Sequence, residues 1–234
     1  MKSLKRLIFV LLLSVTTSLT IQAAVITGQV RTKGSPISGV VVTDGYSVTK
    51  SDKNGMYKLT ASEKASFVYI SIPSGYSVKA ENSVPQFFQK INPAKIKYDF
   101  ELTKKPVSDK NHGFVVIADP QVWAGKEFSR LRSSVEDIKN EISGLNRPLH
   151  GICCGDIVSN DHSLYGEYNK VIENSGLQFF SVMGNHDMTL YGRSMETSQK
   201  RYEETFGPAY YSYNVGDIHY VALNDNFYIA RDYI

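Results

Sequence analysis

Three short polar clusters in the second half of the chain carry oxygen and nitrogen side chains that could hold metal ions. The clusters are Asp119-Pro120-Gln121, residues 155–161 (GDIVSND) and Gly184-Asn185-His186-Asp187. Each follows an apolar run typical of a buried strand, at residues 114–117, 152–154 and 179–183. Because ligands of open α/β sheets bind beyond the carboxyl ends of the strands, the clusters should converge at one edge of a sheet. Their residue types predict a metal site with hydrolytic chemistry.

The spacing of the clusters fits one strand–helix–strand unit between each pair. Asp119, Asp156 and Asn185 follow one another at intervals close to the roughly 30 residues that such a unit needs. An amphipathic helix is predicted between the first two by apolar residues at steps of three and four, namely Phe128, Leu131, Val135, Ile138, Ile142 and Leu145. Residues 162–175 are a second candidate helix, closed by Gly176. The continuously apolar strands predict a sheet that is covered on both faces.

The clusters resemble the first three sequence blocks of the calcineurin-like metallophosphoesterases, which are D-x-H, G-D-x-x-x-D and G-N-H-D. The resemblance implies an α-β-β-α sandwich that holds two divalent metal ions. It implies that Asp119 binds the first ion, that Asp156 bridges both ions, and that Asn185 binds the second. It also implies that His186 contacts the substrate phosphate and protonates the leaving oxygen, with Asp187 orienting or tuning it.

These residue types suit hydrolysis of a phosphate ester or a pyrophosphate. A bridging carboxylate holds two cations about 3.5–4 Å apart, and such a pair stabilises both the attacking and the leaving oxygen. The pKa of metal-bound water falls to roughly 7, which supplies hydroxide for in-line attack at neutral pH. An imidazole that titrates near neutrality suits proton donation to the leaving group.

Gln121 stands where the common form of the first block has histidine. Its carbonyl oxygen can coordinate a metal and is a harder donor than imidazole, which suits manganese or magnesium. Manganese-dependent ADP-ribose and CDP-alcohol pyrophosphatases resemble this chain in carrying D-x-Q. Gln121 is therefore included in the expected metal set, and a polar loop residue is the alternative. The identity of the metal stays open among manganese, iron, zinc and magnesium.

The later histidine blocks that complete the family's site have no counterpart among the histidines of this sequence. Residues 113–234 are therefore expected to form a partial domain, the first half of the α-β-β-α sandwich, in an interrupted or fragmentary chain. His219 lies in an alternating stretch and is left outside the metal set. Two alternatives to an enzyme remain: a surface or interaction protein with a degenerate phosphoesterase half, and an inactive fragment.

The amino terminus predicts a secretory signal peptide over residues 1–23. Three basic residues precede an apolar stretch from Leu7 to Val15, and Ala23 follows as a small residue for cleavage. The stretch is too short for a comfortable membrane span, and an uncleaved anchor is the alternative. A periplasmic or secreted location is expected. Without these residues the formal charge falls from +3 to zero, which leaves no basic footprint for nucleic acid or a membrane surface.

Residues 24–103 form a separate unit of short strands and turns. Residues 26–30 alternate in polarity, and Gly34-Ser35-Pro36 marks a turn. The pattern predicts a small antiparallel β-sandwich. It resembles the carboxypeptidase-regulatory-like, immunoglobulin-like domains, and a stretch within it resembles the amino-terminal domain of secreted bacterial phosphoesterases. Residues 104–112 would be a linker. A spacer or packing role is expected, with carbohydrate or surface binding as the alternative.

Several single residues near the clusters have expected roles of their own. Cys153 and Cys154 are neighbours in the predicted strand, so they should point to opposite faces and stay as buried free thiols. Asp161 is expected to cap the next helix. Asn160 and His162 are candidate contacts to the site or to a substrate. The substrate and the oligomeric state stay open.

Overall fold

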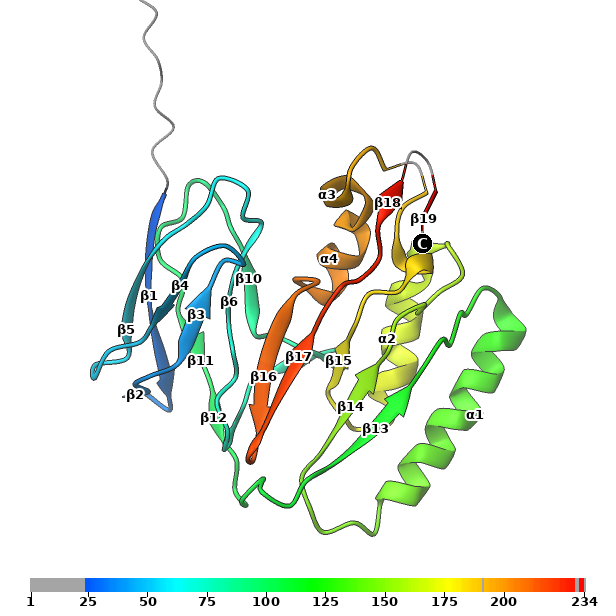
Figure 1. Ribbon diagram of the computed structural model, residues 1–234. Helices are drawn as coiled ribbons and strands as arrows, with labels where there is room; N and C mark the ends of the chain where they lie inside the picture. The colour runs from blue at the N-terminus through cyan, green and yellow to red at the C-terminus, as the bar shows by residue number, and fades with distance from the viewer. Residues whose placement is uncertain (1–23, 191, 230–231, 234) are drawn as a thin grey trace, which may run out of the picture.

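The computed structural model of the chain describes residues 24–190, 192–229 and 232–233, and the predicted signal peptide lies outside the described residues. The chain forms a strand-rich region up to about residue 104 and an α/β region from residue 113 onward, which lie side by side (Figure 1). Within the described part of the chain, no helix has the length and apolar character that crossing a membrane requires.

The strand-rich region contains two four-stranded sheets and two short strand pairs. One sheet consists of β1 (Val25–Thr32), β2 (Ser35–Pro36), β5 (Met56–Thr60) and β11 (Phe100–Glu101). The other consists of β3 (Val41–Thr43), β4 (Val48–Lys50), β6 (Phe67–Ile70) and β10 (Phe88–Lys90). The short pairs are β7 (Tyr76–Ser77) with β12 (Thr103–Lys104) and β8 (Ala80–Glu81) with β9 (Val84–Pro85).

These strand pairs are antiparallel, as expected, except for β1 and β11, which pair in parallel. Before β11 the chain crosses to the second sheet and returns, so it re-enters beside β1 in the same direction. Alternate residues of β1, such as Ile26 and Val30, are buried, and all four residues of β6 are buried. The two sheets therefore enclose a common apolar core.

This core continues into the α/β region. Phe180 and Tyr213 belong to the same buried cluster as the sheet residues. The side chain of Asn214 donates to the backbone oxygen of Ile72 at 2.9 Å. The connection between the regions is anchored as well, because Asp109 is buried and forms an ion pair with Lys105 at 2.8 Å. The two regions thus pack directly on each other.

The α/β region begins with three parallel strands in the order β13 (Gly113–Ile117), β14 (Leu149–Cys153) and β15 (Phe179–Ser181). The first predicted helix is α1 (Gly125–Ile142), which buries Phe128, Leu131 and Val135. The second is a 3-10 turn η1 (His162–Leu164) that leads into α2 (Tyr165–Glu173). The elements that follow are η2 (Asn185–Asp187), α3 (Met195–Ser198), α4 (Lys200–Phe206), β16 (Tyr211–Val215), β17 (Ile218–Ala222), β18 (Tyr228–Ile229) and β19 (Asp232–Tyr233).

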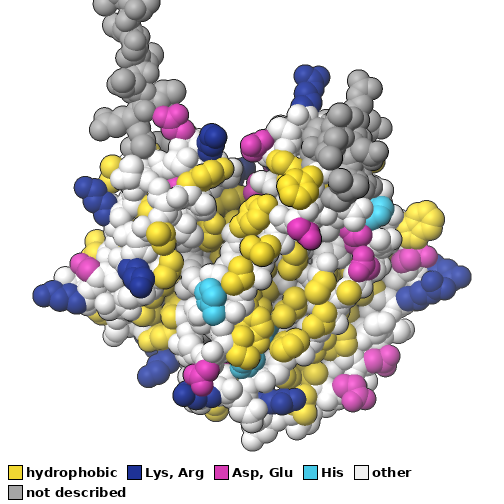
Figure 2. All heavy atoms as spheres, in the orientation of Figure 1, with side chains coloured by type: hydrophobic (Ala, Val, Ile, Leu, Met, Phe, Trp, Pro, Cys, Tyr) yellow, Lys and Arg dark blue, Asp and Glu magenta, His cyan; other side chains and the backbone are white. Residues whose placement is uncertain are grey.

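One face of this region is apolar and exposed at β13, which agrees with the expected half of a two-sheet sandwich and not with a sheet covered on both faces. Phe114 and Val116 are 52% and 50% exposed, whereas Val115 and Ile117 pack on the core beneath the helices. Hydrophobic side chains form a band across this face (Figure 2). Exposure therefore alternates along β13, because helices cover only one side of this strand in the described residues.

The two cysteines differ from the expectation that both are buried. Both are free thiols, but Cys153 is buried and Cys154 is exposed. Cys153 ends β14 and accepts a hydrogen bond from the hydroxyl of Tyr168 at 3.3 Å. Burial raises the pKa of the Cys153 thiol to about 12. Cys154 lies just beyond the strand, where the chain turns toward the candidate site.

Candidate active site

The three polar clusters occupy loops that follow the carboxyl ends of β13, β14 and β15. The ladder between the strands continues to the start of the loops, where the backbone nitrogen of Cys154 donates to the oxygen of Ile117 at 2.9 Å. The first and second loops then stay in contact, because the backbone nitrogen of Gln121 donates to the oxygen of Asp156 at 2.8 Å. Residues far apart in sequence are thus held at one edge of the sheet.

Asp156 joins all three loops through its carboxylate. It is only 6% exposed. Its Oδ1 accepts a hydrogen bond from the backbone nitrogen of His186 at 2.9 Å, and its Oδ2 accepts one from the side-chain amide of Gln121 at 3.1 Å. Charge-assisted hydrogen bonds of this kind are stronger than neutral ones. Asp156 therefore fixes both a predicted metal-binding neighbour and the loop that carries the predicted general acid.

Two glycines let the second and third loops approach closely. A Cβ atom on Gly184 would lie 2.2 Å from both the backbone nitrogen and Oδ1 of Asp156. Gly155 has a φ of +88°, and a Cβ atom there would lie 2.5 Å from the backbone nitrogen of Gly184. Both distances are impossible for a real side chain. The G-D and G-N pairs of the sequence are therefore required by packing at the site.

The site loops also contain an unusual share of left-handed backbone. Seven non-glycine residues of the described chain have a positive φ, and four of them are Asp119, Gln121, Asp156 and Asn160. Such conformations cost of the order of 1–3 kcal/mol each and persist where the surrounding structure imposes them. Because such conformations gather at ligand sites in proteins, their concentration here supports the prediction of a site at this edge.

Asp187 is fully buried, and its carboxylate accepts hydrogen bonds that hold the third loop in place. Its Oδ1 accepts from the hydroxyl of Tyr165 at 2.9 Å and from the backbone nitrogen of Ile157 at 3.2 Å. Its Oδ2 accepts from the backbone nitrogen of Gly184 at 2.9 Å. Burial raises the pKa of Asp187 to about 6, against the lowering effect of these donors. Asp187 thus holds the loop that carries His186, and its expected role of orienting or tuning this histidine stays a prediction.

The imidazole of His186 lies against Asn160. Its Nδ1 is 3.1 Å from Oδ1 of Asn160, so Nδ1 carries a proton and Nε2 is the nitrogen that differs between the neutral and the protonated ring. The backbone oxygen of His186 is 3.0 Å from Nε2 of His162. The candidate contacts Asn160 and His162 therefore both touch His186. Asp161 caps η1 by accepting a hydrogen bond from the backbone nitrogen of Ser163, as predicted.

Sequence reasoning missed two residues that support the third loop. Tyr165 reaches Asp187 from the start of α2. The side-chain amide of Asn226 donates to the backbone oxygen of Met183 at 2.9 Å. Neither belongs to a recognisable sequence block, and no periodic pattern points to them. His219, which was left out of the metal set, pairs with Asn214 within the β16–β17 hairpin.

The side chains at this edge fit a hard divalent cation. Asp119 and Asp156 offer carboxylates, and Gln121 and Asn185 offer amide oxygens, which are the donor types that magnesium and manganese prefer. Across the described residues, no group of three or more His, Cys, Asp and Glu side chains has a metal-holding arrangement. A donor set built from the predicted residues would therefore combine carboxylate with amide oxygens.

Comparison with known proteins gives two matches along the chain. Residues 24–105 match the family model described as the N terminal of calcineurin-like phosphoesterase, and residues 112–233 match the one described as calcineurin-like phosphoesterase. The second match covers just over half of the 234 residues. No curated protein matches the chain. The first match names no immunoglobulin-like fold, so that description of the N-terminal region stays a prediction.

Proposed function

The chain belongs to the calcineurin-like phosphoesterase family, and from this membership we propose that it hydrolyses a phosphate ester or a pyrophosphate at the three-loop edge. The observation that carries the proposal is the buried carboxylate of Asp156, which hydrogen-bonds the loops of Gln121 and His186 at once. Family members typically use two metal ions, and the hard donors at this edge suit such ions.

The metal-holding residues of the proposal are Asp119, Gln121, Asp156 and Asn185. A divalent cation bound there neutralises phosphate charge and makes an attacking water more acidic. The left-handed backbone conformation of Asp119, Gln121 and Asp156 turns the chain away from the extended direction of the preceding strands. The hydrogen bonds to Asp156 set the direction in which its oxygens face before any ligand arrives. This ordering lowers the entropic cost of binding.

His186 supplies the proton for the leaving oxygen in this proposal. The Asn160 oxygen accepts from Nδ1 and orients the ring, so the protonated ring presents its second proton on Nε2. The backbone of His186 is fixed from two sides, by Asp156 at its nitrogen and by His162 at its oxygen. Asp187 holds the same turn from within the core. His186 is thus the catalytic acid in this proposal, and Asn160, His162 and Asp187 are positioning residues.

Turnover of chromogenic esters by the purified full chain tests the proposal. Bis(p-nitrophenyl) phosphate and p-nitrophenyl phosphate are to be assayed with manganese, magnesium, zinc or iron(II), and with EDTA. We expect metal-dependent hydrolysis that EDTA abolishes and that Asp156→Asn lowers about 100-fold or more. Asp161→Asn is the matched control, because it makes the same charge change in the same loop at a helix cap. Absence of metal-dependent turnover, or equal loss in both variants, would refute the proposal.

A further inference from the structure

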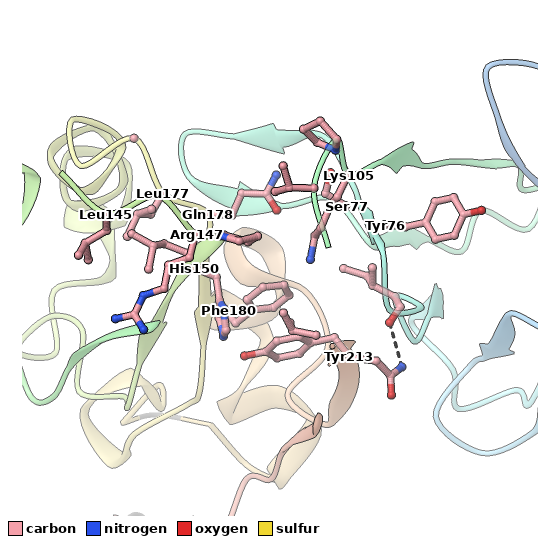
Figure 3. A pocket seen from close by; sticks show the side chains of 18 of the residues that line it. Tyr76, Ser77, Lys105, Leu145, Arg147, His150, Leu177, Gln178, Phe180 and Tyr213 are labelled. Atoms are coloured by element: carbon pink, nitrogen blue, oxygen red, sulfur yellow. Dashed lines mark hydrogen bonds between the residues drawn. The ribbon is translucent and has the colours of Figure 1, made fainter. Parts of the chain in front are cut away.

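A cavity of about 440 Å³ lies at the junction of the two regions, away from the three-loop edge. It is bordered by the amino-terminal ends of β14 and β15, by the end of β16 and by the connecting residues 105–107 (Figure 3). The candidate active site lies at the opposite, carboxyl-terminal ends of the same strands. The volume is within the range of small-molecule binding sites, about 300–1,000 Å³.

The apolar wall of the cavity is built from rigid aromatic rings. Phe180 and Tyr213 stack with centroids 3.7 Å apart and an interplanar angle of 8°, and both side chains are otherwise buried. Figure 3 shows these two rings one above the other, with His150 beside them. Leu149 and Leu177 add aliphatic surface. Such a wall suits a flat apolar body, because aromatic rings pack well against offset or tilted rings.

His150 adds a buried ring to this wall. Its side chain is 6% exposed, and its Nε2 has no hydrogen-bond partner within the described residues. The ring sits among Phe180, Tyr213 and Tyr220, at centroid distances of 5.2 to 6.0 Å. Burial lowers the pKa of His150 to about 4, helped by the nearby charges of His112 and Lys105. The ring is therefore neutral at physiological pH and adds no charge to the wall.

The charged residues that line the cavity are all basic. Arg147 is exposed at its rim and takes part in no ion pair within the described chain, and Lys105 is paired with Asp109. No described aspartate or glutamate lines the cavity. Arg147 is thus a cation with an uncommitted guanidinium group, which suits carboxylate and phosphate geometry. Electrostatic complementarity favours an anionic group at this end of the cavity.

We propose that the junction cavity binds a small apolar anion, a flat hydrophobic body that carries one carboxylate or phosphate group. Arg147 binds the anionic group, and Phe180 and Tyr213 pack against the body beside the neutral ring of His150. Because the lining comes from both regions of the chain, a ligand held there also fastens the regions together. This site is separate from the proposed phosphoesterase site and does not depend on it.

Binding of 2-naphthoate to the full chain tests this proposal. The experiment is calorimetric titration in EDTA, so that no metal at the three-loop edge contributes, with the uncharged 2-naphthamide as the second ligand. We expect saturable binding of 2-naphthoate below about 1 mM and binding of 2-naphthamide about tenfold weaker, as loss of one charge-assisted contact implies. The ring signals of His150 in histidine-labelled protein should shift on titration.

Three variants locate the bound anion. Arg147→Gln should weaken 2-naphthoate binding about tenfold. Arg130→Gln, an equal charge change at an exposed position on α1, should leave it unchanged, and so should Val116→Ser on the exposed apolar face. The proposal is overturned by absence of binding, by equal binding of the amide, by equal affinity of Arg147→Gln, or by loss of binding in Val116→Ser.

Discussion

The backbone nitrogen of His186 donates a hydrogen bond to Oδ1 of Asp156 at 2.9 Å. This contact ties the turn that carries the proposed proton donor to a carboxylate that would hold metal in the proposed site. The other oxygen of Asp156 accepts a hydrogen bond from Gln121. In that site a change at Asp156 should therefore affect both metal binding and the placement of His186.

Gly184→Ala should disrupt the hydrogen bond between Asp156 and His186 without straining the backbone at residue 184. Gly184 has φ −97° and ψ 177°, an extended conformation that alanine adopts freely. The added Cβ would lie 2.2 Å from Oδ1 of Asp156, so the loops must separate. We expect the free energy of unfolding to fall by about 1–3 kcal/mol, and phosphoester hydrolysis to be lost. Urea unfolding and the chromogenic assay measure the two effects.

Gly166→Ala provides the control for this substitution. Gly166 is exposed in α2, and a Cβ atom there would have no neighbour within 4 Å. Alanine should therefore stabilise the chain by about 0.5–1 kcal/mol, because glycine is unfavourable within a helix. Activity should be retained. If Gly184→Ala behaves like Gly166→Ala, the close approach of the two loops is not required.

Tyr165→Phe should weaken the support beneath His186. It removes the hydroxyl that donates to the fully buried Asp187 at 2.9 Å. Loss of a donor to a buried carboxylate costs about 1–3 kcal/mol of unfolding free energy. Activity should fall as well, because Asp187 holds the loop nitrogen of Gly184. Denaturant unfolding at pH 7 and steady-state kinetics are the measurements.

Tyr168→Phe removes a neighbouring buried hydroxyl that donates to the sulfur of Cys153 at 3.3 Å. Sulfur is a weak acceptor, so this variant should lose less than about 1 kcal/mol and keep its activity. Equal destabilisation by the two tyrosine variants would show that the Tyr165–Asp187 bond adds nothing specific to the site.

The sequence predicted the parts of the site that depend on pattern. The strand ends, the two helices and the order of the clusters all follow from apolar periodicity and spacing. The contacts that hold the clusters do not, because Tyr165 meets Asp187 and Asn226 meets Met183 only after the chain has folded. The left-handed backbone conformation of Gln121 could not be predicted from the sequence either, since glutamine has no preference for it. Exposure of Phe114 depends on what covers the sheet, which periodicity cannot reveal.

Asn160→Gly should separate ring orientation from loop folding. Asn160 has a φ of +63°, which glycine adopts without strain, and its oxygen lies 3.1 Å from Nδ1 of His186. We expect the unfolding free energy to change by less than about 1 kcal/mol, while kcat falls about 10–100-fold because the ring loses this hydrogen bond.

Asn82→Gly is the matched control, an exposed asparagine at φ +47° in the strand-rich region. It should leave kcat unchanged. Unaltered kinetics in Asn160→Gly would remove Asn160 from the account of the site.

His150→Phe should change how stability depends on pH. The folded-state pKa of His150 is lowered to about 4 by burial and by the charges of His112 and Lys105. The unfolded chain, with an ordinary histidine pKa of about 6.5, binds the proton first. Stability is therefore full above pH 6.5 and falls as pH drops toward 4, by up to about 3 kcal/mol.

The phenylalanine variant lacks this titration. The difference in unfolding free energy between the natural chain and His150→Phe, measured by urea denaturation from pH 7 to pH 4, should shift in favour of the variant as pH falls. A difference that is constant across this window would mean that His150 is not held neutral in the folded chain.

Manganese binding to the full chain measures the proposed metal site itself. The electron paramagnetic resonance signal of free Mn²⁺ reports the unbound fraction, and the titration is made with the natural chain, Asp156→Asn and Asp161→Asn. We expect saturable binding that Asp156→Asn weakens about 100-fold or more and that Asp161→Asn leaves intact. Absence of binding to the natural chain, or equal binding to all three proteins, would contradict a metal site organised by Asp156.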